Sequence, residues 1–218
     1  MGVNNEEYIM QIIQSLQKLD YIKPEEIPNI DLYMDQVTTF IDEHLSGSKR
    51  YPDDKLLTKT MINNYTKNNL LPSPNKKKYS KEHMLLLIFI YYFKNILSIS
   101  DIQTIFTPLT ERFYNHQNDI SLEEIYNQIF QLSEEQINSL TKDVIRKYTK
   151  AKDTFSDTDN DEDKEFLQTF SFICMLSFDV YVKKVIIEKL IDKTVSGISE
   201  PDTKKKKKEK KEKPENLQ

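Results

Sequence analysis

The fold is decided around Leu57-Thr-Lys-Thr-Met-Ile-Asn-Asn-Tyr-Thr-Lys-Asn-Asn-Leu-Leu-Pro-Ser-Pro-Asn-Lys-Lys-Lys-Tyr-Ser-Lys-Glu-His83, which contains a short polar helix and then a proline-punctuated, lysine-rich turn. Helical spacing over residues 57–68 predicts that Met61, Ile62 and Tyr65 face inward. The outward face then consists of Thr60, Asn63, Asn64 and Lys67. This face is polar and carries little charge, which suits the reading of base edges.

The same stretch is the centre of a basic region in an acidic protein. Between residues 49 and 81, nine Lys or Arg residues stand against Asp53 and Asp54, so nine minus two gives a local charge of +7 in a chain of net charge −4. A protein that binds duplexes regardless of sequence needs such concentrated positive charge to displace phosphate counterions. The charge therefore predicts duplex DNA as a partner.

Composition predicts an all-α protein. The 218 residues include only three Gly and no Trp, and Ile, Leu, Lys, Glu, Asn and Gln are abundant. Apolar periodicity and capping signals place helices at about residues 5–19, 31–45 with Asp31 as cap, 57–68, 80–96 with Ser80 as cap, 98–106, 121–130, 133–151 and 164–192. Capping boxes at Ser98, Ser121 and Ser133 mark three of the starts, and Pro108 is expected to end the helix at 98–106.

The C-terminal third has three different compositions. An acidic stretch, residues 153–165, is interpreted as a solvated linker. Residues 166–182 are apolar nearly all round, which predicts burial by the same domain or by a second subunit, with Cys174 as a packed core residue. Residues 204–213 are almost all lysine, so the tail is expected to be disordered, with or without an anionic partner.

Localisation and chemistry are predicted from features that are missing. One cysteine permits no intrachain disulfide, the N-terminus is polar, and the apolar run at 84–93 is too short to cross a bilayer, so we expect a cytoplasmic protein without integral membrane association. The histidines (His44, His83 and His116) lie far apart and no nucleophile, phosphate-loop or dinucleotide motif occurs. We therefore predict no enzyme, no catalytic residue, no metal site and no cofactor.

The order of these parts resembles the winged helix-turn-helix of the mercury-resistance-regulator (MerR) family. The resemblance rests on Tyr65, Leu70-Leu71-Pro72, the lysines at 76–78, Tyr79-Ser80 and the segment 97–102. It implies a recognition helix in the major groove, with Asn63 and Asn64 pairing with adenine and the lysines reaching phosphates. The family's glycine before Leu-Leu-Pro is replaced by Asn69, and the basic wing is short.

Residues 27–108 are more specifically similar to the bacterial family of domain of unknown function 1836. The similarity lies in segments 27–37, 57–65, 70–72 and 78–80. It implies a MerR-like DNA-binding half followed by a helical half, with gene regulation as the associated role.

The sequence thus predicts an elaborated MerR-like winged helix-turn-helix followed by a helical C-terminal domain. The expected division is 1–29 for a helix and connector, 30–108 for the winged-helix domain, 109–152 for a helical extension, 153–165 for the linker, 166–199 for a dimerisation helix and 200–218 for the tail. The expected DNA-binding residues are Lys59, Thr60, Asn63, Asn64, Tyr65, Lys67, Lys76, Lys77, Lys78 and Tyr79.

The predicted function is that of a DNA-binding transcriptional regulator acting as a homodimer. The dimer would form through Phe166, Phe170, Ile173, Leu176, Val180, Ile187 and Leu190 of the last helix. The alternative is a non-enzymatic protein-interaction module, with a degenerate winged helix whose basic face docks an acidic protein.

Overall fold

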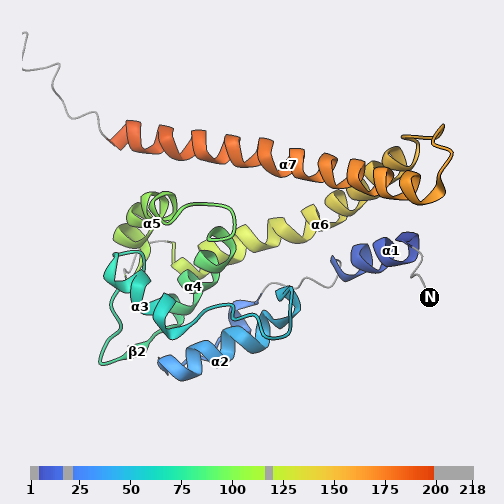
Figure 1. Ribbon diagram of the computed structural model, residues 1–218. Coiled ribbons are helices and arrows are strands. Elements are labelled where there is room, and N and C mark those ends of the chain that lie inside the picture. The colour runs from blue at the N-terminus through green and yellow to red at the C-terminus, as the bar shows by residue number, and fades with distance from the viewer. Residues whose placement is uncertain (1–4, 17–21, 116–119, 199–218) are drawn as a thin grey trace, which may run out of the picture.

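The computed structural model describes residues 5–16, 22–115 and 120–198, and this part of the chain is mainly helical (Figure 1). The predicted all-α class is confirmed. The helices are α1 (Asn5–Leu16), α2 (Met34–His44), α3 (Lys59–Lys67), α4 (Lys81–Phe93), α5 (Ile99–Phe113), α6 (Leu122–Lys152) and α7 (Asp161–Ile198). The described residues also form the 3-10 turns η1 (Pro24–Glu26) and η2 (Ser46–Ser48). Two short strands are present as well, β1 (Leu32–Tyr33) and β2 (Lys78–Tyr79). The end of the first predicted helix and the lysine tail lie outside the described residues.

Helix α4 forms the centre of the hydrophobic core. Every residue from position 83 to 91 is buried, as the apolar run predicts. The Phe89 ring contacts the rings of Tyr126 and Phe130 on α6, at centroid distances of 5.2 and 5.6 Å. The Tyr126 hydroxyl also donates to the carbonyl of Ile22 at 2.6 Å, which joins the N-terminal connector to the same core. Burial of a large apolar helix of this kind is the main source of folding free energy.

The two strands join segments that lie far apart in the sequence. Leu32 pairs with Tyr79 and Tyr33 pairs with Lys78 in antiparallel register. This pairing corrects the predicted cap of α2, because residues 32 and 33 belong to a strand and the helix begins only at Met34. The N-cap is therefore Tyr33 and not Asp31, and the Tyr33 N–H donates to Gln36 Oε1 at 2.9 Å.

Two of the three predicted capping boxes are confirmed. The Ser98 hydroxyl accepts from the Asp101 N–H at 3.1 Å, and the Ser121 hydroxyl accepts from the Glu124 N–H at 3.1 Å. The third prediction is wrong, because Ser133 lies inside α6, a single helix of 31 residues. No Gly or Pro interrupts residues 122–152, so a capping pattern alone does not start a new helix there.

Pro108 was also expected to end a helix, and this prediction is wrong. Helix α5 continues past it to Phe113. A proline removes one backbone donor, at a cost that packing can offset. Ile102 and Phe106 are fully buried here, and the hydroxyls of Thr107 and Thr110 donate to carbonyls of the preceding turn at 2.8 and 2.9 Å.

Helices α6 and α7 form a long antiparallel arm, and α7 runs back over α5 (Figure 1). The predicted acidic linker is shorter than expected: α7 already begins at Asp161, where Asn160 Oδ1 accepts from the N–H of Glu162 at 2.9 Å. Lys147 on α6 forms ion pairs with Asp143 and Asp179, and the second pair ties the two helices together.

Cys174 on α7 is exposed, so its predicted place in the core is wrong. The apolar segment around it packs on α6 along one side only, and Phe172 is buried while Phe170 and Phe178 are more than half exposed.

None of the described helices is long and apolar enough to span a bilayer.

Candidate nucleic-acid interface

Helix α3 presents the polar face that the sequence predicts. Its N-cap is Thr58, whose hydroxyl accepts from the Met61 N–H at 3.1 Å. Ile62 is fully buried and Tyr65 is 6% exposed, and these two residues hold the helix on the core. The exposed residues are Lys59, Thr60, Asn63, Asn64 and Lys67. Because α3 contains no acidic residue, this face offers amide and hydroxyl groups between two lysines.

The end of α3 is fixed by a left-handed cap. Asn69 has a φ of 55°, its N–H donates to the Thr66 carbonyl at 3.1 Å, and the Leu70 N–H donates to the Tyr65 carbonyl at 2.8 Å. These two bonds define a Schellman motif, in which the left-handed position usually holds Gly and sometimes Asn. Leu70 and Leu71 are buried, so the chain leaves α3 in a fixed direction toward the lysine turn.

The predicted basic wing is a tight turn. Lys76 and Lys77 have φ values of 47° and 65°, and the Lys78 N–H donates to the Asn75 carbonyl at 2.9 Å. Positive φ at both central residues is typical of a type I′ turn. Only one isolated bridge, Asn75 with Lys78, joins its two arms, because β2 pairs instead with β1. The turn therefore presents two exposed lysines on a rigid base.

Contacts with the start of α2 bring α3 and the turn together. Lys59, the first residue of α3, forms an ion pair with Asp35. Tyr33, two residues before Asp35, is exposed, and its ring centroid lies 5.2 Å from Lys78 Nζ in a cation–π contact. The β1–α2 junction thus contacts both the N-terminal end of α3 and the last lysine of the turn, which places the two basic elements beside the same segment.

Two predicted site residues are core residues. Tyr65 is 6% exposed and Tyr79 is 3% exposed, and burial raises the pKa of both phenols. Neither ring is available at the surface for a base or phosphate. The residues that remain accessible are Lys59, Thr60, Asn63, Asn64, Lys67, Lys76, Lys77 and Lys78.

His83 stabilises the segment that follows the lysine turn. The N–H of Ser80, which directly follows β2, donates to His83 Nδ1 at 3.0 Å, and the Tyr114 hydroxyl lies 3.0 Å from Nε2. The ring is 2% exposed, and burial lowers the pKa of His83 despite the opposing effects of backbone groups and Asp31. A neutral ring that accepts at Nδ1 completes the cap of α4. The sequence marks Ser80 as this cap but does not reveal that His83 completes it.

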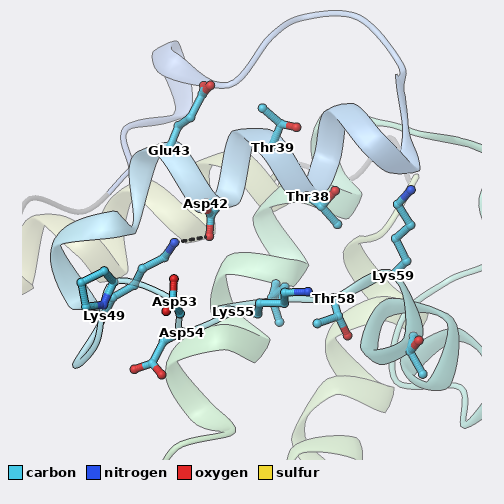
Figure 2. Close-up of a pocket in the computed structure, with 13 residues that line it drawn as sticks. Thr38, Thr39, Asp42, Glu43, Lys49, Asp53, Asp54, Lys55, Thr58 and Lys59 are labelled. Carbon is cyan, nitrogen blue, oxygen red and sulfur yellow. Dashed lines mark ion pairs between the residues drawn. The ribbon is translucent and has the colours of Figure 1, made fainter.

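A polar groove of about 650 Å³ lies between α2 and the segment that leads to α3 (Figure 2). Thr38, Thr39 and Asp42 line it from α2, and Asp53, Asp54 and Lys55 line it from the opposite side. Lys49 pairs with Asp42 at 2.7 Å across it. The groove ends at Thr58 and Lys59, next to the N-terminus of α3. Its walls, residues 38–43 and 49–60, are close in the sequence, but no helical or strand periodicity indicates how the irregular segment between them folds.

Within the described ranges, no three His, Cys, Asp or Glu side chains gather into a group that could hold a metal ion. His83 is buried, and His44 Nδ1 lies 2.9 Å from the Phe40 carbonyl. His116 lies outside the described residues.

The chain is therefore a mainly helical protein with a lysine-bearing surface built from α3 and a tight turn. It belongs to the DUF1836 family, a domain of unknown function, because the family model matches residues 22–130. This confirms the family resemblance stated for residues 27–108 and extends it to residues 22–130, which include the end of α5 and the start of α6. No curated protein and no solved structure matches the chain.

Proposed function

We propose that this protein is a DNA-binding regulator with an elaborated MerR-like winged helix-turn-helix. In this proposal α2 and α3 are the two helices, and the turn at 75–78 with β1 and β2 is a short wing. The single observation that carries the proposal is the acid-free exposed face of α3, fixed through the β1–α2 junction beside the lysine turn. Phosphate contacts from such lysines position a helix for base reading.

The accessible residues have distinct roles in this proposal. Asn63 and Asn64 are the base readers, because a side-chain amide can bond bidentately to adenine in the major groove. Lys67, Lys76 and Lys77 contact phosphates, which adds affinity without sequence preference. Lys59 contributes less, because Asp35 already neutralises part of its charge.

Residues 45–58, which connect α2 to α3, are the elaboration of the motif. A helix-turn-helix usually has a turn of about three or four residues. Here η2 and the wall of the polar groove occupy this connection, and Leu56 and Leu57 bury it against the core. We infer that this insertion preserves the placement of α3 because its ends are held by Lys49–Asp42 and Lys59–Asp35.

We also infer that the regulator acts as a homodimer in the cytoplasm. The lone cysteine suits a reducing compartment. Two copies related by a two-fold axis would present two α3 helices to a pseudo-palindromic site.

Fluorescence anisotropy with a mixed-sequence duplex tests the proposal. A variant ending at Ser199 removes the lysine tail, which would bind any polyanion. Reversal of Lys76, Lys77 and Lys78 to Glu should abolish micromolar binding. The matched control is K142E/K183E/K189E, which changes the net charge equally at exposed sites on α6 and α7. Equal losses in both triple variants, or no binding of the parent at low salt, would refute the proposal.

The alternative function is a protein-interaction module that docks an acidic protein on the same basic face. The observation that favours it is the minimal wing, with one bridge between its arms and Lys78 engaged with Tyr33. Binding of an acidic peptide that tolerates N63A/N64A, together with no duplex binding, would place this function first.

A further inference from the structure

The polar groove between α2 and residues 49–60 has an acidic end near η2 (Figure 2). Four carboxylates and one ammonium group line this end, those of Asp42, Glu43, Asp53, Asp54 and Lys49. Lys49 pairs with Asp42 at 2.7 Å, and Asp54 Oδ2 accepts from the Tyr51 N–H at 2.9 Å. Among the described residues, Asp53 has no ion-pair partner. Four minus one leaves a local charge of −3, so this end attracts a further cation.

The other end of the groove, beside the start of α3, is basic. Lys55, Thr58 and Lys59 line it, and in the described part of the chain Lys55 has no ion-pair partner. The Thr58 oxygen accepts from the Met61 N–H at 3.1 Å, so its own O–H can donate to an anion. Lys59 pairs with Asp35, but both side chains are more than half exposed, and an anion in the groove can compete for this ammonium group.

Opposite charges at the two ends disfavour a uniformly charged polymer. A phosphate backbone that filled the groove would meet the four carboxylates, and a lysine-rich segment would meet Lys55 and Lys59. A ligand with a cation at one end and an anion at the other satisfies both ends. Between them, Thr38 and Thr39 offer hydroxyl groups and Leu57, which is 5% exposed, offers a small apolar surface.

We propose that the groove binds a short peptide with free termini, with its ammonium group at the acidic end and its carboxylate at the basic end. The length of the groove sets the size of this ligand. A helix rises about 1.5 Å per residue, so α2 spans roughly 10 Å from Asp35, which holds Lys59, to Asp42, which holds Lys49. An extended chain of about three residues spans the same length. The groove volume of about 650 Å³ lies within the range of small-molecule sites, roughly 300–1,000 Å³.

This inference goes beyond the proposed function, and its test uses no DNA. Trialanine is titrated into the isotope-labelled full chain, and the backbone amide resonances are followed by NMR. We expect saturable shifts centred on residues 53–60, with a Kd on the order of 1 mM. N-acetyl-trialanine and trialanine amide each lack one charge, and each should bind about fivefold more weakly, because an exposed ion pair contributes at most a factor of about five. No saturable shift of these residues at about 10 mM trialanine, or equal binding of the three peptides, would overturn the proposal.

Two variants test the orientation of the peptide. Asp53→Asn should weaken binding of trialanine but not of its N-acetyl form, and Lys55→Gln should weaken binding of trialanine but not of its amide. The matched controls Asp159→Asn and Lys142→Gln make the same charge changes at exposed positions between α6 and α7 and on α6, and should leave the Kd unchanged. Equal losses in the groove variants and the controls, or equal weakening of the free and capped peptides by Asp53→Asn, would overturn the proposal.

Discussion

Replacement of Asn69 tests how the end of α3 is fixed. Its φ of 55° lies in the left-handed region, where a residue with a Cβ costs roughly 1–2 kcal/mol and Asn costs less because its side chain bonds locally. Asn69→Ala should therefore lower the free energy of unfolding by about 1 kcal/mol. Asn69→Gly removes the steric cost but adds freedom to the unfolded chain, so it should stay within about 0.5 kcal/mol of the parent.

Asn68 is the matched control for this prediction. It precedes Asn69 but has a φ of −93°, which any residue adopts, and its Nδ2 donates to the Asn64 carbonyl at 2.9 Å in an exposed position. Asn68→Ala should cost about 0.5 kcal/mol or less, because an exposed hydrogen bond contributes little. Urea unfolding followed by far-UV circular dichroism measures the three variants. An Asn69→Ala protein as stable as the parent would refute the left-handed cap as the end of α3.

Three further predictions concern the core, the ion pair at the start of α3 and the base of the turn. Phe89→Ala should lower the free energy of unfolding by about 3–5 kcal/mol, measured by urea unfolding, because it leaves a cavity against α6. Lys59→Ala should change that free energy by less than about 1 kcal/mol, because the ion pair with Asp35 is exposed. Burial lowers the pKa of His83, so the unfolded chain binds more protons below its ordinary value of 6.5. The contribution of the neutral His83 to the free energy of unfolding should be fully present above pH 6.5 and should decrease as the pH drops below it. The midpoint of urea unfolding should therefore fall less in His83→Gln than in the parent over this pH range.

Local patterns were enough to predict much of the candidate site. The inward and outward faces of α3 follow from the helical spacing of Ile62 and Tyr65, and the buried α4 follows from its uninterrupted apolar run. The caps at Ser98 and Ser121 follow from short-range hydrogen bonds that the sequence specifies directly.

The remaining features depend on contacts between distant residues. The pairing of β1 with β2 joins Leu32 with Tyr79, 47 residues apart, and Tyr33 with Lys78, 45 residues apart, and no local signal gives it. The same reason explains the His83–Tyr114 contact. The polar groove lies within residues 38–60, but it depends on how the irregular segment after α2 folds, which no periodic pattern gives. Pro108 carries a local stop signal that tertiary packing overrides. Ser133 carries a start signal inside a run of residues without Gly or Pro, so the helix continues through it. Cys174 was misplaced because an apolar segment does not reveal which of its sides the same chain covers.

The most direct test of the proposed DNA-binding surface is to locate the duplex on it. A single cysteine in a Cys174→Ser variant ending at Ser199, placed at Asn64, at Lys77 or at Ile186, carries a photoreactive benzophenone. The proposal predicts covalent protein–DNA adducts from positions 64 and 77, and none from position 186 on α7. Adducts that are absent from both α3 and the turn, or equally frequent at all three positions, would contradict it.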